Sequence, residues 1–539
     1  MPLPVATSPM RRLSLFALGM MVPLLVALIT RHAWEDWWIT FRASKNLAMG
    51  YGLVFEPGQV LQTFTSPFSA LVPAFLSWIT GNHNDDLVLW LYRLVGSVLL
   101  GGTVLNLDRL ARLQGFARPA LWFTLGFFLI DAKITDFSMN GQEAAYLVFF
   151  MSLTLVALVE QRTLLLGVAW AGLMWSRPDS PVYIAATGIG YLLATAWEAR
   201  AELGATFRRF FKAGLLTSAL FGPWLAWTTW YYGSPISHTI VAKGLRHTPR
   251  TLGDGLLHFV EYPVKSLLGY APSALSGVFM PAEYMFGGWP YWLQVLSRLL
   301  TLLAGLAWLM PRVSRLVRTT SMGVFLGGFY LDYIAPFPAA WYYPILTLLT
   351  IVTLGGLLQI ALDNLANKVV ERRVLLGMAA LVLAAWTVVS ACEVYEMRVQ
   401  QAVIEDGGRR QIGLWLKQHA TPGHRNTVAL ECLGYIGYFS GLKMYDYPGM
   451  SSPEMVAARS RYGEHPAVLI NVLAPDWVVL RPREIDIIAG YNQDFANNYE
   501  QVAVFDQTAK LAAYSFLPGR GYLRYDRVFY VYHRKASHS

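Results

Sequence analysis

Cysteine and charge are both scarce in this chain of 539 residues. Its two cysteines, Cys392 and Cys432, are too few for a disulfide framework or a cysteine-based metal site. A single bridge between them is open only if both face an oxidising compartment. Charged residues make up 14% of the chain and hydrophobic residues 55%, which excludes an ordinary soluble protein. The composition therefore predicts a polytopic membrane protein.

The excess of basic over acidic residues, 43 against 34, does not indicate a nucleic-acid partner. The lysines and arginines lie in short clusters between apolar segments, without a basic stripe interleaved with stacking aromatics. Clusters of this kind are typical of cytoplasmic loops. No small-x-small cleavage site follows the first apolar run, so we interpret that run as a retained span.

Eleven apolar runs are candidates to cross the roughly 30 Å of hydrocarbon in a bilayer. They are 13–30, 87–107, 117–131, 143–160, 163–177, 181–198, 210–231, 290–310, 320–335, 340–361 and 373–391. We expect the shorter apolar segment 67–80 to form an interfacial helix, because only then do the basic clusters all fall on one side of the membrane. This topology predicts a cytoplasmic N-terminus and an external C-terminus.

The expected fold is a polytopic α-helical domain, residues 1–391, followed by an external α/β domain, residues 392–539. External segments of the first domain include 31–86, a short turn from Asp131 to Gln142, and a long loop at 232–289. In the second domain, 409–418 has the pattern of an amphipathic helix, and short apolar strands are expected at 427–431, 477–480 and 528–532.

Two adjacent carboxylates, Glu35 and Asp36, follow the first span and precede Arg42. Charge at a membrane boundary is costly and usually functional. Such a pair can bind a divalent cation, or one member can be a general base, or both can favour the start of a helix through its dipole. If a helix begins there, Glu35, Arg42 and Asn46 share one face and Asp36 points elsewhere. Two carboxylates alone do not define a metal site.

The stretch Asp36-Trp-Trp-Ile-Thr-Phe-Arg42, with Asn46 to Gly58 and Thr65-Ser-Pro-Phe68, resembles the first external loop of GT-C glycosyltransferases. It is most similar to the bacterial arabinofuranosyltransferase-like branch. Further segments that resemble this branch in chain order are 140–143, 176–179, 232–243 and 434–449. The chain departs from the pattern at Glu35, where Asp is usual, and at His238, where Asn is usual.

The resemblance implies a GT-C membrane glycosyltransferase in the cytoplasmic membrane that takes its sugar from a polyprenyl-phosphate donor. The sugar is expected to be a pentose such as D-arabinofuranose, and the acceptor an extracytoplasmic envelope glycan or a surface glycoprotein such as pilin. Asp36 is expected to be the general base, with Glu35 in support. The expected partners of the donor phosphate are Arg42, Lys243, Arg177 and Lys45, and the expected substrate-positioning residues are His238, Glu143, Tyr342 and Tyr343. Arg177 is also expected to pair with Asp179, and Gly434, Gly437 and Gly441 fit turns better than a phosphate cradle.

Two other functions are considered. A transporter or flippase of lipid-linked sugars is typically marked by charges at the midplane of its spans, whereas Arg93 and Arg298 lie near span ends. A glycan polymerase or ligase with a diphosphate-linked donor is favoured by basic external loops without an acidic pair in the first loop.

Overall fold

The apolar runs fold as helices. The computed structural model describes residues 8–244, 251–268, 274–335, 339–424, 426–491 and 494–536. A helix lies at each of the eleven predicted runs, which confirms this prediction. These helices are α1 (Pro9–Thr30), α4 (Asp85–Leu113), α5 (Arg118–Ile130), α7 (Ala144–Val159), α8 (Thr163–Ser176), α9 (Ser180–Glu198), α10 (Leu203–Tyr232), α14 (Tyr291–Leu306), α15 (Arg315–Phe329), α16 (Pro344–Asn364) and α17 (Val369–Val399).

Within the described residues, five helical stretches are long and apolar enough to cross a membrane. A sixth is added if α6 (Ala132–Met139) and α7, which meet at an angle of 117°, count as one broken span. The fold is therefore that of a multi-span membrane protein, as predicted, while the number of eleven crossings stays a prediction. Helix α3 (Pro67–Ile79) is apolar but has only 13 residues, the length expected of an interfacial helix.

By the density of internal contacts, the chain divides into two units. The first contains the described residues of 1–29, 92–224 and 250–395. The second contains those of 30–91, 225–249 and 396–539, so the first external segment belongs with the C-terminal residues. The predicted domain bounds, 1–391 and 392–539, follow chain order and stay a prediction.

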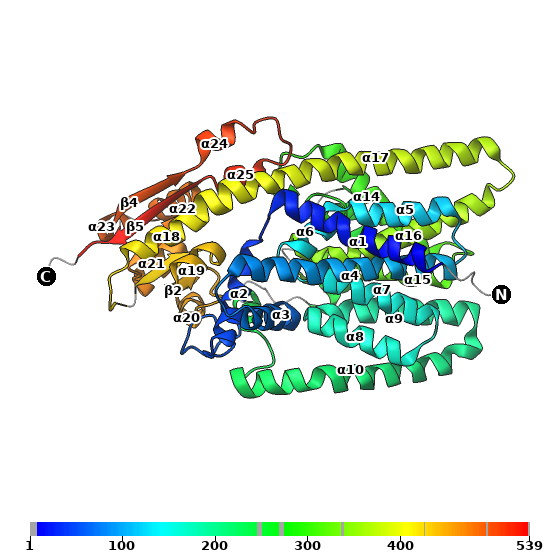
Figure 1. Ribbon diagram of the computed structural model, residues 1–539, viewed down its shortest axis with the longest axis horizontal. Coiled ribbons are helices and arrows are strands. Elements are labelled where there is room, and N and C mark those ends of the chain that lie inside the picture. Colours follow the sequence, from blue (N-terminus) through cyan, green and yellow to red (C-terminus); the bar gives the residue numbers. More distant parts are fainter. Residues whose placement is uncertain are drawn as a thin grey trace. The chain divides into compact units, whose positions relative to one another are not determined.

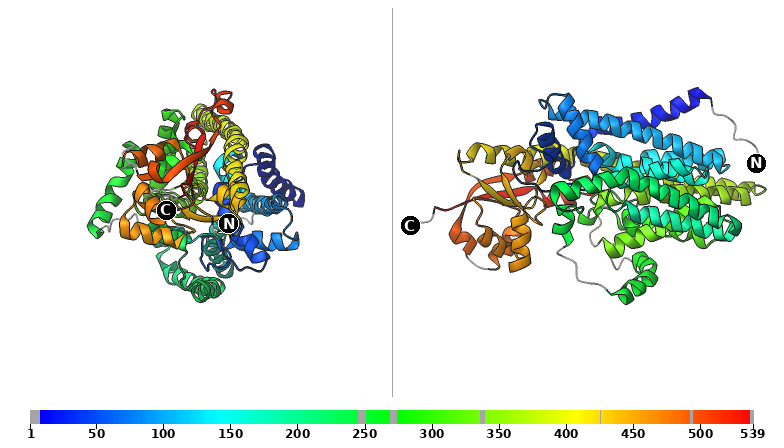
Figure 2. Two further views of the ribbon diagram at one scale, coloured as in Figure 1. Left: turned by 90° about the vertical axis from the view of Figure 1, so that its left-hand side faces the viewer. Right: turned by 90° about the horizontal axis from the view of Figure 1, so that it is seen from below.

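The helices of the first unit pack closely where small residues face each other. A methyl group added to Gly19 on α1 would lie 3.0 Å from the Cα of Gly101 on α4, and one added to Gly190 on α9 would lie 3.0 Å from the Cα of Thr319 on α15. Small residues let membrane helices approach closely enough for dispersion contacts to hold them. Several of these helices lie with their axes roughly parallel to one another (Figures 1 and 2).

Two predicted loops contain helices. The turn expected from Asp131 to Gln142 forms α6, whose start is capped by Asp131 because its Oδ1 accepts the Ile134 N–H at 2.7 Å. The loop expected at 232–289 contains α11 (His238–Gly244), α12 (Leu252–Leu268) and α13 (Ala274–Gly277). Both segments contain polar residues and lack a continuous run of about 18 apolar residues, so the hydropathy pattern predicted loops there. Short 3-10 and π turns complete this unit: η1 (Arg200–Glu202), η2 (Tyr284–Phe286), η3 (Ala307–Leu309), η4 (Tyr330–Ile334) and η5 (Ala340–Tyr342).

The second unit contains a five-stranded mixed sheet in the order β2-β1-β3-β5-β4, drawn in orange to red in Figure 1. The strands are β1 (Thr427–Leu430), β2 (Lys443–Asp446), β3 (Trp477–Leu480), β4 (Tyr499–Asp506) and β5 (Val528–Arg534). Strand β1 is parallel to β2 and β3, whereas β5 is antiparallel to β3 and β4. The predicted α/β domain and its three predicted strands are confirmed, and β2 and β4 are additional.

Helices surround this sheet and complete its core. They are η6 (Gln400–Arg409), α18 (Arg410–His419), α19 (Gly434–Ser440), α20 (Pro453–Tyr462), α21 (Pro466–Leu473), α22 (Pro482–Ala489), α23 (Asp494–Asn498), α24 (Thr508–Ala512) and α25 (Gly521–Tyr525). The predicted helix at 409–418 is α18. Ile39 and Phe55, from the first external segment, are buried in the same apolar cluster as Val428 and Ile436. Cys392 and Cys432 are free thiols.

Candidate active site

The acidic pair lies in the first turn of helix α2 (Glu35–Ala48), after an extended Trp34 at the N-cap position. Trp34 offers no side-chain cap, and acidic residues in the first turn favour the start of a helix. As predicted, Glu35 and Arg42 share a face, because both contact α19. Asn46, one turn further along, donates to the Val54 and Phe55 carbonyls.

Glu35 is committed to a partner. Its carboxylate forms an ion pair with Arg409 at 2.5 Å and accepts the Gly434 N–H at 3.2 Å. Burial raises the pKa of Glu35 to about 8, and the nearby Glu405 carboxylate adds to the rise while Arg409 opposes it. Gly434 is required here, since a Cβ on it would lie 2.0 Å from the Glu35 carbonyl oxygen.

Asp36 is partly exposed, as is Glu35. It follows Glu35 directly in the helix, so its Cβ points about 100° away from the face that contacts α19. The two adjacent carboxylates therefore have different surroundings. Glu35 contacts an arginine and a backbone amide on the α19 side, whereas Asp36 is directed to another side of α2.

The Arg42 guanidinium contacts the other end of α19. It donates to the Gly437 carbonyl at 2.7 Å and to the Gly441 carbonyl at 3.3 Å, and it lies 4.2 Å from the ring centre of Phe55. Glu35 at the N-terminus of α19 and Arg42 at its C-terminus match the direction of the helix dipole. In this arrangement Arg42 joins two elements, so a phosphate would compete with its carbonyl partners.

Lys45, one turn further along α2, also binds partners within the protein. Its ammonium forms an ion pair with Asp85 at 2.6 Å and lies 3.3 Å from the Tyr438 hydroxyl, which donates to the same carboxylate at 2.6 Å. The three side chains form a half-buried cluster.

The segment 232–244 packs on the first external segment. Tyr232 donates its hydroxyl hydrogen to the Leu53 carbonyl at 2.6 Å, and the His238 backbone N–H donates to the Gln62 carbonyl at 3.0 Å. The His238 ring is half-buried and hydrogen-bonds the Gly449 backbone near Asp446, and burial lowers its pKa. Lys243, on the same short helix, is exposed.

In the first unit, Arg177 is buried between two carboxylates. It donates to Asp179 at 2.8 Å, as predicted, and also to Glu143 at 2.7 Å. The Tyr342 ring stacks on its guanidinium at 4.2 Å. Three of the predicted site residues, Glu143, Arg177 and Tyr342, therefore form one cluster.

Tyr343 lies in another buried contact of the same unit. The Lys133 ammonium lies 4.9 Å from the Tyr343 ring centre. That ammonium also donates to the carbonyls of Gly277, Val278 and Met280, which anchors the segment after α13.

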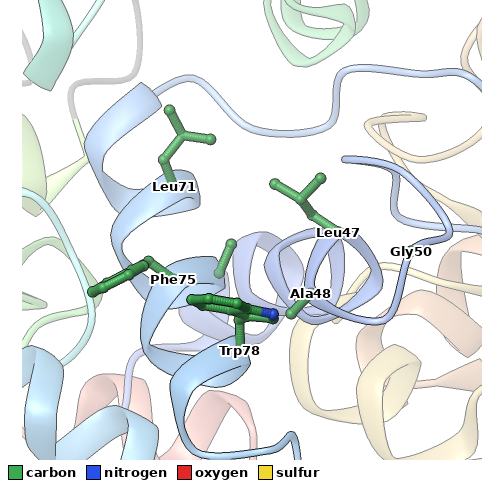
Figure 3. A pocket seen from close by; sticks show the side chains of 7 residues that line it. Leu47, Ala48, Gly50, Leu71, Phe75 and Trp78 are labelled. Atoms are coloured by element: carbon green, nitrogen blue, oxygen red, sulfur yellow. The ribbon is translucent and has the colours of Figure 1, made fainter.

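An apolar groove of about 400 Å³ lies between α2 and α3 (Figure 3). Leu47 and Ala48 at the end of α2 lie opposite Phe75 and Trp78 on α3, with Leu71 nearby. Phe75 and Trp78 are exposed. A short apolar helix with an exposed tryptophan suits the predicted interfacial position of α3.

The donor set at the acidic pair does not fit a divalent cation. Glu35 is paired with Arg409, which leaves Asp36 as the remaining predicted ligand. In the part of the chain that the structure describes, no three or more His, Cys, Asp and Glu side chains gather as a metal site would require.

Sequence reasoning missed Arg409 and Tyr438, which contact the first external segment from the C-terminal part of the chain. One signal was present, because Glu405 and Arg409 are spaced i,i+4 beside an amphipathic helix. That spacing is common, and nothing in it points to a partner almost 400 residues earlier.

The chain is similar to known proteins in its sequence and in its fold. A family model described as a domain of unknown function, DUF8728, matches residues 393–532. The terminal β-(1→2)-arabinofuranosyltransferase of Corynebacterium glutamicum is 26% identical over 239 residues, 39% of this chain and 32% of that protein. The chain thus matches about a third of the length of that relative.

Among solved structures, ArnT from Cupriavidus metallidurans bound to undecaprenyl phosphate matches with a TM-score of 0.53 and 12% identity, over 98% of this chain and 99% of ArnT. The apo state of the same protein matches with a TM-score of 0.50 and 12% identity, over 97% and 98%. The chain therefore has a fold like that of ArnT, and its predicted resemblance to the arabinofuranosyltransferase-like branch is confirmed.

Proposed function

We propose that this protein is a GT-C glycosyltransferase that moves a sugar from a polyprenyl-phosphate donor to an acceptor outside the cytoplasmic membrane. The sequence similarity to an arabinofuranosyltransferase and the fold shared with ArnT support this reaction class. A pentose such as D-arabinofuranose is the proposed sugar. An envelope glycan or a surface glycoprotein such as pilin is the proposed acceptor.

The observation that carries the proposal is the unequal environment of the acidic pair. Glu35 points toward α19 and is engaged by Arg409, whereas Asp36, the next residue, is directed to another side of α2 and is partly exposed. Asp36 takes the proton of the acceptor hydroxyl while the hydroxyl oxygen bonds to the anomeric carbon and the bond from that carbon to the phosphate oxygen breaks. Because the displacement is single, the anomeric configuration inverts. The polyprenyl phosphate leaves with its negative charge.

Lys243 is the proposed partner of the donor phosphate. Its exposed ammonium is accessible to an anion, whereas Arg42 and Lys45 already bind carbonyls and a carboxylate within their own unit. Arg42 and Lys45 then act mainly by holding the first external segment in shape. His238 is proposed to position a substrate from the same segment as Lys243.

In the first unit, Glu143, Arg177 and Tyr342 are proposed to position a substrate as one cluster, with Tyr343 beside it. The proposed orientation places the N-terminus in the cytoplasm and the C-terminal α/β domain outside. The tyrosines and tryptophans of that domain are proposed to contact the acceptor glycan.

A transfer assay with purified protein tests this function. The protein is incubated with a panel of polyprenyl-phosphate sugars, pentoses and hexoses, and with envelope glycan or pilin as acceptor, with and without a chelator. The Asp36→Asn protein should lose at least about 100-fold in turnover, the usual contribution of a general base. The control is Asp86→Asn, which changes an exposed carboxylate of the same external segment. Equal turnover by wild type and Asp36→Asn would remove Asp36 from the role of base.

A further inference from the structure

A buried cluster of charges surrounds the start of α2. The Arg409 guanidinium contacts Glu35 at 2.5 Å, Glu405 at 3.0 Å and the Tyr522 hydroxyl at 3.0 Å, and it also donates to Asp526. Its side chain is 2% exposed. Three carboxylates from separate segments of the chain therefore meet on one arginine.

A second arginine extends the cluster. Arg481 donates to the other oxygen of Asp526, and it also contacts Glu431 at 2.8 Å and Glu484 at 2.9 Å. Asp526 lies between the two guanidinium groups with 1% of its side chain exposed. Arg409 is thus held from several sides, and its orientation is defined independently of Glu35.

Other contacts fix the same turn of α2. The Ala33 N–H donates to Gln401 at 2.9 Å, and the Ala33 carbonyl accepts the Tyr435 hydroxyl at 3.0 Å. The Trp38 ring packs against Tyr438 with a centroid distance of 4.7 Å. Residues before and after Asp36 in the sequence, Ala33 and Trp38, therefore have defined contacts.

Stability alone does not explain a cluster of buried charges. Burying an arginine with its carboxylates costs several kcal/mol of desolvation per ion, and apolar residues of similar volume often stabilise a fold as well or better. The guanidinium group of arginine is planar and rigid, so its hydrogen bonds fix the orientation of the groups that accept them. This favours a role of Arg409 in orienting its carboxylate partners.

We propose that Arg409 is a positioning residue that sets the direction of the Asp36 carboxylate by fixing the first turn of α2 through Glu35. This inference rests on the proposed function of Asp36 as the base. A base misplaced by about 1 Å loses roughly 100-fold in rate, since the near-attack geometry is lost. The effect acts on turnover, while donor binding is little changed.

The test compares Arg409→Lys with Arg410→Lys. Arg410 is a matched control, because it is the next residue, pairs with Asp406 in the same i,i+4 way at 3.5 Å, and is 43% exposed. Lysine keeps the charge and loses the fork. For Arg409→Lys we expect turnover to fall at least 10-fold, with the KM for the donor within about 2-fold of wild type. Amide hydrogen exchange in residues 35–42 should rise, and Arg410→Lys should match wild type in all three readouts.

Glu35→Ala keeps the proposal testable if Arg409→Lys fails to fold, because Glu405 and Asp526 still compensate Arg409 in that variant. It should give the same fall in turnover and the same rise in exchange. The double variant should be no slower than the slower single variant. Unchanged exchange and turnover in either single variant, or additive losses in the double variant, would overturn the proposal.

Exchange and turnover separate two kinds of failure. If the wild type transfers no sugar, the proposed function fails, while exchange still reports whether Arg409 fixes the turn. If the wild type transfers sugar and exchange rises without a loss of turnover, the positioning role fails and the proposed function stands.

Discussion

At the scale of the residue, Glu35 lies among several other acidic side chains. Glu35 shares Arg409 with Glu405 and Asp526, and Glu431 lies near enough to add to the negative potential. This surplus of acid and the burial of the site raise the pKa of Glu35 to about 8. The folded protein therefore holds a proton there at pH values where the unfolded chain has lost it.

The pH dependence of stability follows from this shift. Between the ordinary pKa of a glutamate and about 8, the folded state binds more protons at Glu35 than the unfolded state, so its contribution to stability falls as pH rises. Glu35→Gln cannot ionise. We expect the melting temperature of wild type, relative to this variant, to decline from pH 5.5 to pH 8, measured by scanning fluorimetry in detergent. Parallel curves over this range would contradict the raised pKa.

The exposed ammonium of Lys243 gives a second prediction at this scale. A charge-assisted hydrogen bond contributes about 1.5–3 kcal/mol, so Lys243→Ala should raise the KM for the donor about 10-fold or more and change turnover less. The exposed Lys417→Ala serves as the control. An unchanged dependence of the rate on donor concentration would show that Lys243 does not bind the donor phosphate.

At the scale of the element, α2 and α19 pack with almost no space between their starts. The Gly434→Ala variant places a methyl group where the Glu35 carbonyl already lies. We expect it to lower the melting temperature by several degrees and to reduce turnover, because the start of α2 has to move. Gly408→Ala is the control, since its added methyl group has neighbours at 3.9 Å. Similar behaviour of both variants would mean that the contact is not tight in solution.

Helices and short strands were predictable because their signals are local. The eleven apolar runs predicted the long helices of the first unit closely, and Trp477–Leu480 was predicted to the residue as β3. The partners of Arg42 were not predictable, since Gly437 and Gly441 lie about 400 residues away and carbonyl groups carry no sequence signal. Arg177 with Asp179 was predictable, because both lie in one turn.

At the scale of the whole molecule, the distribution of basic residues predicts the orientation in the membrane. A fluorescent reporter inserted after Arg312 should be active, as expected in the cytoplasm. A phosphatase fused after Ser539 should be active, as expected outside. The reverse result at Ser539 would place the C-terminal domain in the cytoplasm and overturn the proposed side of the reaction.

The division into two units has a consequence for synthesis. The segment 30–91 leaves the ribosome early, yet three of its partners, Arg409 for Glu35, Gly437 for Arg42 and Tyr438 for Lys45, come after residue 395. About 300 residues separate the two, and at roughly 5–20 residues per second the delay is about 15–60 seconds. During that time α2 can pack on α3 but lacks its contacts with α19, including those of Trp38 with Tyr435 and Tyr438. The turn that holds the candidate base Asp36 therefore gains its contact with Arg409 only after the C-terminal residues have been made.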